Sequence, residues 1–203
     1  MVAFLADEIS ALRIVLPLIE SFAKSHYDLH DDLHGLQHIL RTFEHARRIQ
    51  IIEGGSWEVI SAIIWLHDIG RPYETTQHIH HAKISHDLAQ PFLAELNLPN
   101  SIRSVILEGI LAHSFSIGQR ANILEAKIVS DADKLDALGA IGIFRACAFQ
   151  YAQKTGIQGV LQHLEAKLLH LDNEIYLPSS LTLARERIAR LLRFKEELLE
   201  ELG

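Results

Sequence analysis

The chain has 203 residues, of which 48% are hydrophobic and 22% charged, as in globular proteins large enough to bury a core. A net charge of −7 without any lysine or arginine block argues against partners such as a nucleic-acid polymer or an anionic membrane. Cys147 is the single cysteine, so no internal disulfide can form, and the N-terminus lacks the basic segment of a signal peptide. These features predict a cytoplasmic protein.

Apolar residues at helical spacing predict helices from the start of the chain. The stripe Leu5–Ile19 indicates a first helix, which Pro17 is expected to kink or break. A second helix is expected over 34–55. A third, over 57–70, has Ser56 as its cap and is apolar on nearly every face, so it should lie at the centre of the fold.

The rest of the chain continues the helical pattern. Further helices are expected over 80–96, 101–114, 125–153 (as one helix or two) and 182–202. No strand-like alternation, internal repeat or linker interrupts them. The sequence therefore predicts an all-α protein with one domain over 1–203, with core motifs within about 26–146 and C-terminal helices within about 160–202.

Histidines and carboxylates follow core-facing residues in three separate segments. His34 and His38 lie four residues apart on the second predicted helix, His67 and Asp68 end the third, and Asp131 follows a buried apolar run. Helical bundles build metal sites from such side chains. Each residue alone has a simpler explanation: His67 as a core histidine bonded to a carbonyl, or Asp131 as a helix cap. Only the combination indicates a metal site.

Three motifs stand in a characteristic order along the chain: "HILR", "LHDIG" and "DADKLDALG". Together they resemble the H…HD…D pattern of the HD-domain metal-dependent phosphohydrolases. With "AHSFS" at 112–116, the likeness extends over roughly 26–202 and is similar to the small bacterial single-domain branch of predicted HD hydrolases. The stretch 125–146 is more specific than the bare His-Asp pair, which occurs again at 86–87.

The resemblance implies an HD-domain helical bundle that binds one divalent ion, which could be Mn, Fe, Co, Ni, Zn or Mg. The ligands it implies are His38, His67, Asp68 and Asp131. His38 is preferred to His34 because it precedes Arg41 by three residues, as in the family pattern. Gly35 stands where family members usually carry an aspartate, which removes no metal ligand.

The activity that the resemblance implies is hydrolysis of a phosphoester or phosphoanhydride by a metal-activated water. The substrate is expected to be a nucleotide or a similar small phosphorylated molecule, and the enzyme a nucleotidase or a nucleoside triphosphate pyrophosphohydrolase. Asp68 and Lys134 are assigned to the catalytic machinery. The residues assigned to substrate binding are Arg41, His113 and Arg145. Glu74, six residues after Asp68, is either a general base or a surface glutamate.

Alternatives remain open at this point. His81 and His113 stand where some HD proteins hold a second metal, which would allow two-metal hydrolysis or diiron oxygenase chemistry. Otherwise His113 contacts the substrate phosphate and His81 lines the cleft. His80 is read as a surface residue. A third alternative is a nucleotide-binding sensor without turnover.

The apolar helix at 137–149 or the C-terminal helix could pack against a second copy in a homo-oligomer.

Overall fold

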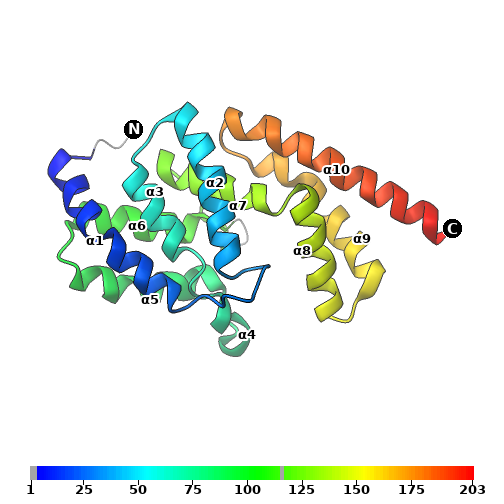
Figure 1. The fold of residues 1–203 in the computed structure, drawn as a ribbon, viewed down its shortest axis with the longest axis horizontal. Coiled ribbons are helices and arrows are strands. Elements are labelled where there is room, and N and C mark those ends of the chain that lie inside the picture. The colour runs from blue at the N-terminus through cyan, green and yellow to red at the C-terminus, as the bar shows by residue number, and fades with distance from the viewer. Residues whose placement is uncertain (1–3, 115–116) are drawn as a thin grey trace. The chain divides into compact units, whose positions relative to one another are not determined.

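The computed structural model describes residues 4–114 and 117–203, and within these ranges the regular structure is helical throughout (Figure 1). The predicted all-α fold is confirmed. Contacts between Cα atoms group the chain into two units: one ends at Ser130, and the other spans Asp131–Gly203. The boundary falls within one helix, α7 (Leu124–Asp136). Among the described residues, no helix is long and apolar enough to cross a membrane.

The first unit is built around the short apolar helix α3 (Trp57–Leu66). The other elements of this unit are α1 (Ala6–Lys24), α2 (Leu36–Glu53), η1 (Arg71–Tyr73), α4 (Glu74–Gln77), α5 (His81–Glu95) and α6 (Asn100–Ala112). Helices α1, α2, α5 and α6 all pack against α3. Every α3 residue from Val59 to Leu66 is buried, which confirms the predicted central position. Each large aliphatic side chain buried in this way stabilises the fold by about 1.5–3 kcal/mol.

Both ends of α3 are fixed by polar contacts. At its start, the Ser56 hydroxyl accepts a hydrogen bond from the Val59 N–H at 3.4 Å, as the sequence predicts. The Ser56 N–H in turn donates to the buried Glu125 carboxylate at 2.9 Å. At its end, the His67 N–H still bonds the Ile63 carbonyl at 2.9 Å. The chain then turns, so His67 and Asp68 lie directly after the buried C-terminal part of α3.

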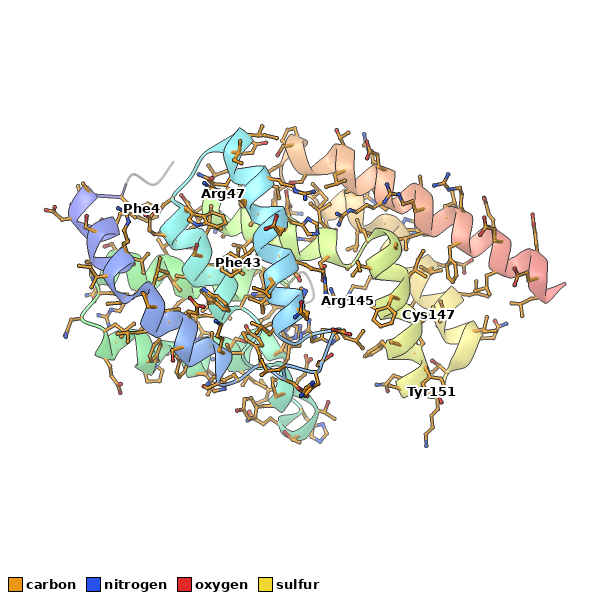
Figure 2. The ribbon with its side chains drawn as sticks, viewed as in Figure 1. Phe4, Phe43, Arg47, Arg145, Cys147 and Tyr151 are labelled. Carbon is orange, nitrogen blue, oxygen red and sulfur yellow. The ribbon has the colours of Figure 1, made fainter. Side chains whose placement is uncertain are left out.

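Aromatic side chains hold α2 against α3. The Phe43 ring, labelled in Figure 2, lies 5.0 Å from the Trp65 ring and 6.0 Å from the Trp57 ring between centroids. These separations are typical of stabilising aromatic pairs. His38, also on α2, is fully buried, and its ring centroid lies 5.6 Å from that of His67 at the end of α3.

The turn after Asp68 packs very closely on α5. The Gly70 N–H donates to the Ser85 hydroxyl at 2.9 Å. A Cβ at Gly70 would lie 2.6 Å from the Ser85 nitrogen and 2.8 Å from the Ile84 Cβ, and would collide with the His81 carbonyl oxygen. Only glycine therefore lets the start of α5, and with it His81, approach the end of α3 so closely.

Gly70→Ala is expected to lower the free energy of unfolding by about 1–3 kcal/mol, because the added methyl group meets backbone atoms that cannot move aside independently. Urea unfolding followed by circular dichroism measures the change. Ala94→Ser, at an exposed position of α5, is the control and should change stability far less. Equal stability of Gly70→Ala and the wild type would contradict the close approach.

The second unit continues from α7 into a group of helices that pack on one another. These are α8 (Gly139–Ala152), α9 (Gly156–Ala166), η3 (Leu168–Glu174) and α10 (Pro178–Leu202). Gly139, at φ +73°, begins α8 in a backbone conformation that favours glycine. The expected helix over 125–153 is thus two helices. Figure 2 shows Arg145 and Cys147 along α8 and Tyr151 near its end.

Two predicted features of the helices differ in the structure. The helix does not break at Pro17, because α1 continues through this exposed residue to Lys24, whereas a kink there stays a prediction. His34 lies before α2, which begins at Leu36, so His34 and His38 do not share a helix face. Gly35, the N-cap of α2, packs so closely on the preceding turn that a Cβ there would collide with the carbonyl oxygens of Asp28 and Asp31. This backbone therefore has no room for the aspartate that the resemblance implies at this position.

Candidate metal centre

The centre of the polar cluster in the first unit is the buried carboxylate of Asp68. Two imidazoles approach one of its oxygens, Oδ2. The Nε2 atom of His38, from α2, lies 3.7 Å away, and the Nε2 atom of His67 lies 3.8 Å away. All three residues are buried, and their donor atoms lie within 4.8 Å of one another. The predicted ligands His38, His67 and Asp68 are thus brought together.

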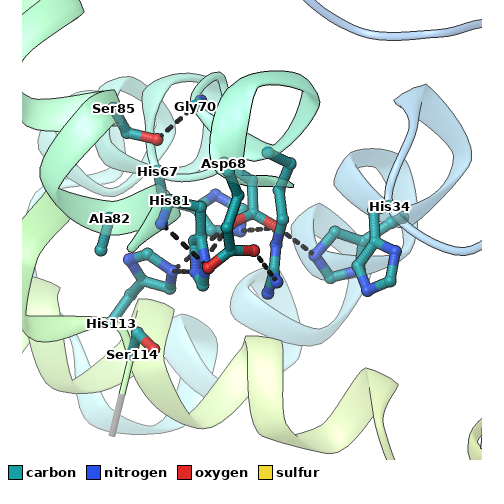
Figure 3. A network of polar contacts seen from close by, with 12 residues as sticks. His34, His67, Asp68, Gly70, His81, Ala82, Ser85, His113 and Ser114 are labelled. Carbon is teal, nitrogen blue, oxygen red and sulfur yellow. Dashed lines mark hydrogen bonds and ion pairs between the residues drawn. The ribbon is translucent and has the colours of Figure 1, made fainter. Parts of the chain in front are cut away.

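Two further imidazoles approach the other carboxylate oxygen of Asp68, Oδ1. The Nε2 atoms of His81 and His113 lie 3.4 Å and 3.5 Å from it, and 3.3 Å from each other (Figure 3). His81 begins α5, and His113 follows the last residue of α6. One carboxylate is therefore shared by two groups of three donors, each fully buried.

Hydrogen bonds at the far side of two rings set which nitrogen faces Asp68. The Nδ1 atom of His67 lies 2.8 Å from the Ile64 carbonyl oxygen, and that of His113 lies 2.6 Å from the Ile110 carbonyl oxygen. A carbonyl can only accept, so Nδ1 carries the proton in both rings. In a neutral ring the lone pair then sits on Nε2, which is the nitrogen directed at Asp68. This is the tautomer that binds a metal through Nε2.

The donor set fits a divalent cation. Nitrogen and carboxylate ligands at about 2.0–2.2 Å from one ion lie about 3.0–3.5 Å from each other at ordinary coordination angles. The separations of 3.4 Å and 3.5 Å from Oδ1 fall in this range, and those of 3.7 Å and 3.8 Å from Oδ2 exceed it by a few tenths of an ångström. Imidazole and carboxylate together suit transition metals and zinc better than calcium.

The electrostatics of the cluster keep Asp68 in its metal-binding form. Burial by itself would raise the pKa of the Asp68 carboxyl, but the Arg71 guanidinium and the surrounding imidazoles outweigh it and hold the pKa well below its ordinary value. The Arg71 Nε lies 3.1 Å from Asp68 Oδ2. Burial also lowers the pKa of His81, despite the opposing charge of Asp68. A charged carboxylate and a neutral imidazole are the forms that ligate metals.

Asp131, the remaining predicted ligand, belongs to the second unit. Its two oxygens accept hydrogen bonds from the Tyr176 and Leu177 N–H groups at 2.8 Å and 2.9 Å, where the chain enters α10. Burial raises the pKa of the Asp131 carboxyl, although these donors act in the opposite direction. Asp131 lies inside α7, so it is not the cap of its own helix and that simpler explanation is wrong, whereas metal ligation by Asp131 stays a prediction.

The predicted catalytic lysine and substrate-binding arginines have other contacts within their own units. The Lys134 ammonium lies 5.2 Å from the centroid of the Tyr176 ring, and burial lowers its pKa. Arg145 donates to the buried Asp136 carboxylate at 2.6 Å. Arg41 donates to the Asp32 carbonyl at 3.0 Å. Contact of Lys134, Arg145 and Arg41 with a substrate stays a prediction. In the "AHSFS" motif, residues 115–116 lie outside the described part of the chain.

His80 is a residue whose position the sequence did not reveal. It is half-buried rather than at the surface, and its ring centroid lies 4.2 Å from that of His81. Its Nδ1 accepts a hydrogen bond from the Ala82 N–H at 3.2 Å, which makes His80 the cap of α5. With Glu74 and His81 it forms a third group of potential metal donors, less buried than the other two. Its place at the start of a predicted helix was the available signal.

Comparison with known proteins agrees with this geometry. The sequence profile of the HD domain matches residues 35–138, about half of the chain. The chain belongs to the HD domain family. The matched residues include both histidines and the aspartate of the first donor group, and they end just before α8.

Several proteins of known structure are similar to this HD-domain protein. YpgQ of Bacillus subtilis is 39% identical over 83 residues, a match that spans 39% of this chain and 40% of YpgQ. Its crystal structure has a TM-score of 0.76 at 24% identity and covers 95% and 97% of the two chains. YpgQ has also been crystallised in complex with ADP. An HD-superfamily hydrolase of Bacillus thuringiensis has a TM-score of 0.67 at 25% identity and covers 94% and 98%.

Asp68→Asn is expected to lower the affinity for Mn²⁺ or Zn²⁺ by more than about 100-fold, because it removes a donor oxygen and a charge together. Loss of a residue that only hydrogen-bonds a metal ligand lowers the affinity by up to about 100-fold. Isothermal titration calorimetry of the metal-stripped protein measures the change. Asp87→Asn is the matched control, since it alters the other His-Asp pair, whose carboxylate is half exposed. An Asp68→Asn protein that is folded by circular dichroism and binds metal as tightly as the wild type would contradict the assignment.

Proposed function

We propose that the protein is a metal-dependent phosphohydrolase that cleaves a phosphoester or phosphoanhydride bond of a nucleotide or a similar small phosphorylated substrate. The observation that carries this proposal is the Asp68 carboxylate shared by His38 and His67 on one side and by His81 and His113 on the other. The family membership and the hydrolase fold of the similar structures support it. The complex of YpgQ with ADP supports a nucleotide as the substrate class.

The proposed ligands are His38, His67 and Asp68, with Asp131 as the fourth by the family pattern. When bound, a divalent ion lowers the pKa of a coordinated water and reduces the negative charge on a phosphate. The chain's own residues supply the rest. Asp68 can accept a hydrogen bond from the attacking water, because its low pKa keeps it ionised. The Lys134 ammonium is proposed to balance charge that develops on the phosphate oxygens.

His113 has two proposed roles, as a contact to the substrate phosphate or, with His81, as part of a second metal site. The geometry favours the second role. His113 keeps its proton on Nδ1 to bond the Ile110 carbonyl, and His81 keeps its own on Nδ1 to bond the Glu74 carboxylate 3.0 Å away, so the Nε2 lone pairs of the two rings face each other at 3.3 Å. Two facing lone pairs repel unless a cation lies between them. This arrangement also supports a second candidate function, a diiron oxygenase, which iron-loaded protein would reveal by a visible absorption band.

Metal-loaded protein is expected to release a product from at least one member of a panel of nucleoside mono-, di- and triphosphates. Ion-exchange chromatography separates the products. Orthophosphate would indicate a nucleotidase, and pyrophosphate a nucleoside triphosphate pyrophosphohydrolase. Each substrate is tested with Mn, Fe, Co, Ni, Zn and Mg in turn.

Asp68→Asn and Asp87→Asn are run beside the wild type in the same assay. The product should disappear with Asp68→Asn and persist with Asp87→Asn. Tight nucleotide binding without turnover under every metal would overturn the hydrolase and support a sensor. If Asp68→Asn gives as much product as the wild type, the reaction takes place at another site or is due to a contaminant, and the assignment of Asp68 is contradicted.

A further inference from the structure

Two members of the second donor group, Asp68 and His81, form a closed ring of polar contacts with Arg71 and Glu74. Arg71 Nε contacts Asp68 Oδ2 at 3.1 Å, and Arg71 Nη1 contacts Glu74 Oε2 at 3.3 Å. Glu74 Oε1 lies 3.0 Å from the Nδ1 atom of His81. The Nε2 atom of His81 closes the ring at 3.4 Å from Asp68 Oδ1. Each carboxylate contributes one oxygen to Arg71 and the other to His81.

The backbone after α3 makes this ring possible. Asp68, Arg71 and Glu74 are spaced three residues apart, and the segment folds into consecutive tight turns. The Arg71 N–H bonds the Asp68 carbonyl at 3.0 Å, and Arg71–Tyr73 form a 3₁₀ helix, in which side chains three residues apart lie on one side. The chain then reverses through His78, at φ +54°, and returns His81 to Glu74.

Glu74 fixes His81 at two atoms with a single oxygen. Besides its contact with the ring, Glu74 Oε1 accepts a hydrogen bond from the His81 backbone N–H at 3.1 Å. An ionised carboxylate can only accept, so the proton of the neutral His81 ring lies on Nδ1. The lone pair is then on Nε2, directed at Asp68 and His113. Without this acceptor, the ring would be free to move its proton to Nε2 and to rotate away.

We propose that Glu74 is a positioning residue that directs His81 Nε2 toward the metal as a ligand. Arg71 fixes the positions of the Glu74 and Asp68 carboxylates by a hydrogen bond to each. The inference rests on the proposed metal centre and adds to it the residue that prepares the second donor group to bind a metal ion. It also assigns Glu74 differently from a general base, because both of its oxygens are already engaged, one by His81 and one by Arg71.

Two variants separate positioning from proton transfer. Glu74→Ala removes the acceptor, whereas Glu74→Gln loses the charge but keeps a carbonyl oxygen that can accept from His81. Long-range ¹H–¹⁵N spectra of protein with ¹⁵N-labelled histidine report the tautomer of each ring without any metal, and a His81→Gln sample assigns the signal. The wild type is expected to show the His81 proton on Nδ1. Glu74→Ala should shift it toward Nε2 or to a mixture, and Glu74→Gln should largely preserve it.

Binding of Mn²⁺, measured by calorimetry, tests the consequence for the metal. The affinity of Mn²⁺ for the donor group that contains His81 is expected to fall about 10–100-fold in Glu74→Ala. In Glu74→Gln this affinity should return toward that of the wild type. Glu95→Ala, an exposed glutamate at the end of α5, is the control. Circular dichroism confirms that each variant is folded.

The outcomes distinguish this inference from the proposed function. An unchanged His81 tautomer and unchanged Mn²⁺ binding in folded Glu74→Ala would overturn the positioning role, whatever the enzyme does. Glu74→Gln that keeps the tautomer and the metal but loses turnover as completely as Glu74→Ala would identify a general base instead. A wild type that shows the expected tautomer but binds no metal would refute the proposed function while leaving the Glu74–His81 contact in place.

Discussion

A charged carboxylate buried at the end of an apolar helix is the constraint on which the polar structure of the first unit depends. Asp68 is 1% exposed, so it has lost nearly all of its hydration, and an uncompensated charge there would cost several kcal/mol. Arg71 provides a full positive charge, and imidazoles surround both oxygens. The segments before and after α3 bring Arg71 and these imidazoles to the Asp68 carboxylate.

This constraint explains features that would otherwise look unrelated. Gly70 allows α5 to approach the turn after Asp68, and Glu125 holds the start of α3 through Ser56. The Ser130 hydroxyl bonds the His113 carbonyl at 3.1 Å, so α7 is tied to the end of α6 one residue before Asp131. Rigid helices and their ends thus fix the donors before any ion arrives, which reduces the entropic cost of binding.

Sequence periodicity predicted the helices because amphipathic and fully apolar segments carry a strong local signal, as α3 and its Ser56 cap show. The family pattern selected His38 over His34, and the burial of His38 beside Asp68 agrees. Helical periodicity could not place His34 outside α2, since the chain before Leu36 forms an irregular turn in which the Gly35 and Leu36 N–H groups bond the Asp31 and Asp28 carbonyls. The contact of Glu74 with His81 likewise depends on the reversal at His78, which no periodicity encodes.

The central claim is that the group formed by His38, His67 and Asp68 binds a metal ion. The most direct test is a crystal structure of the Zn²⁺-loaded protein with anomalous diffraction measured at the zinc absorption edge. We expect an anomalous peak about 2.0–2.2 Å from Asp68 Oδ2 and from the Nε2 atoms of His38 and His67. Full occupancy of zinc elsewhere, with no peak at Asp68, would contradict it.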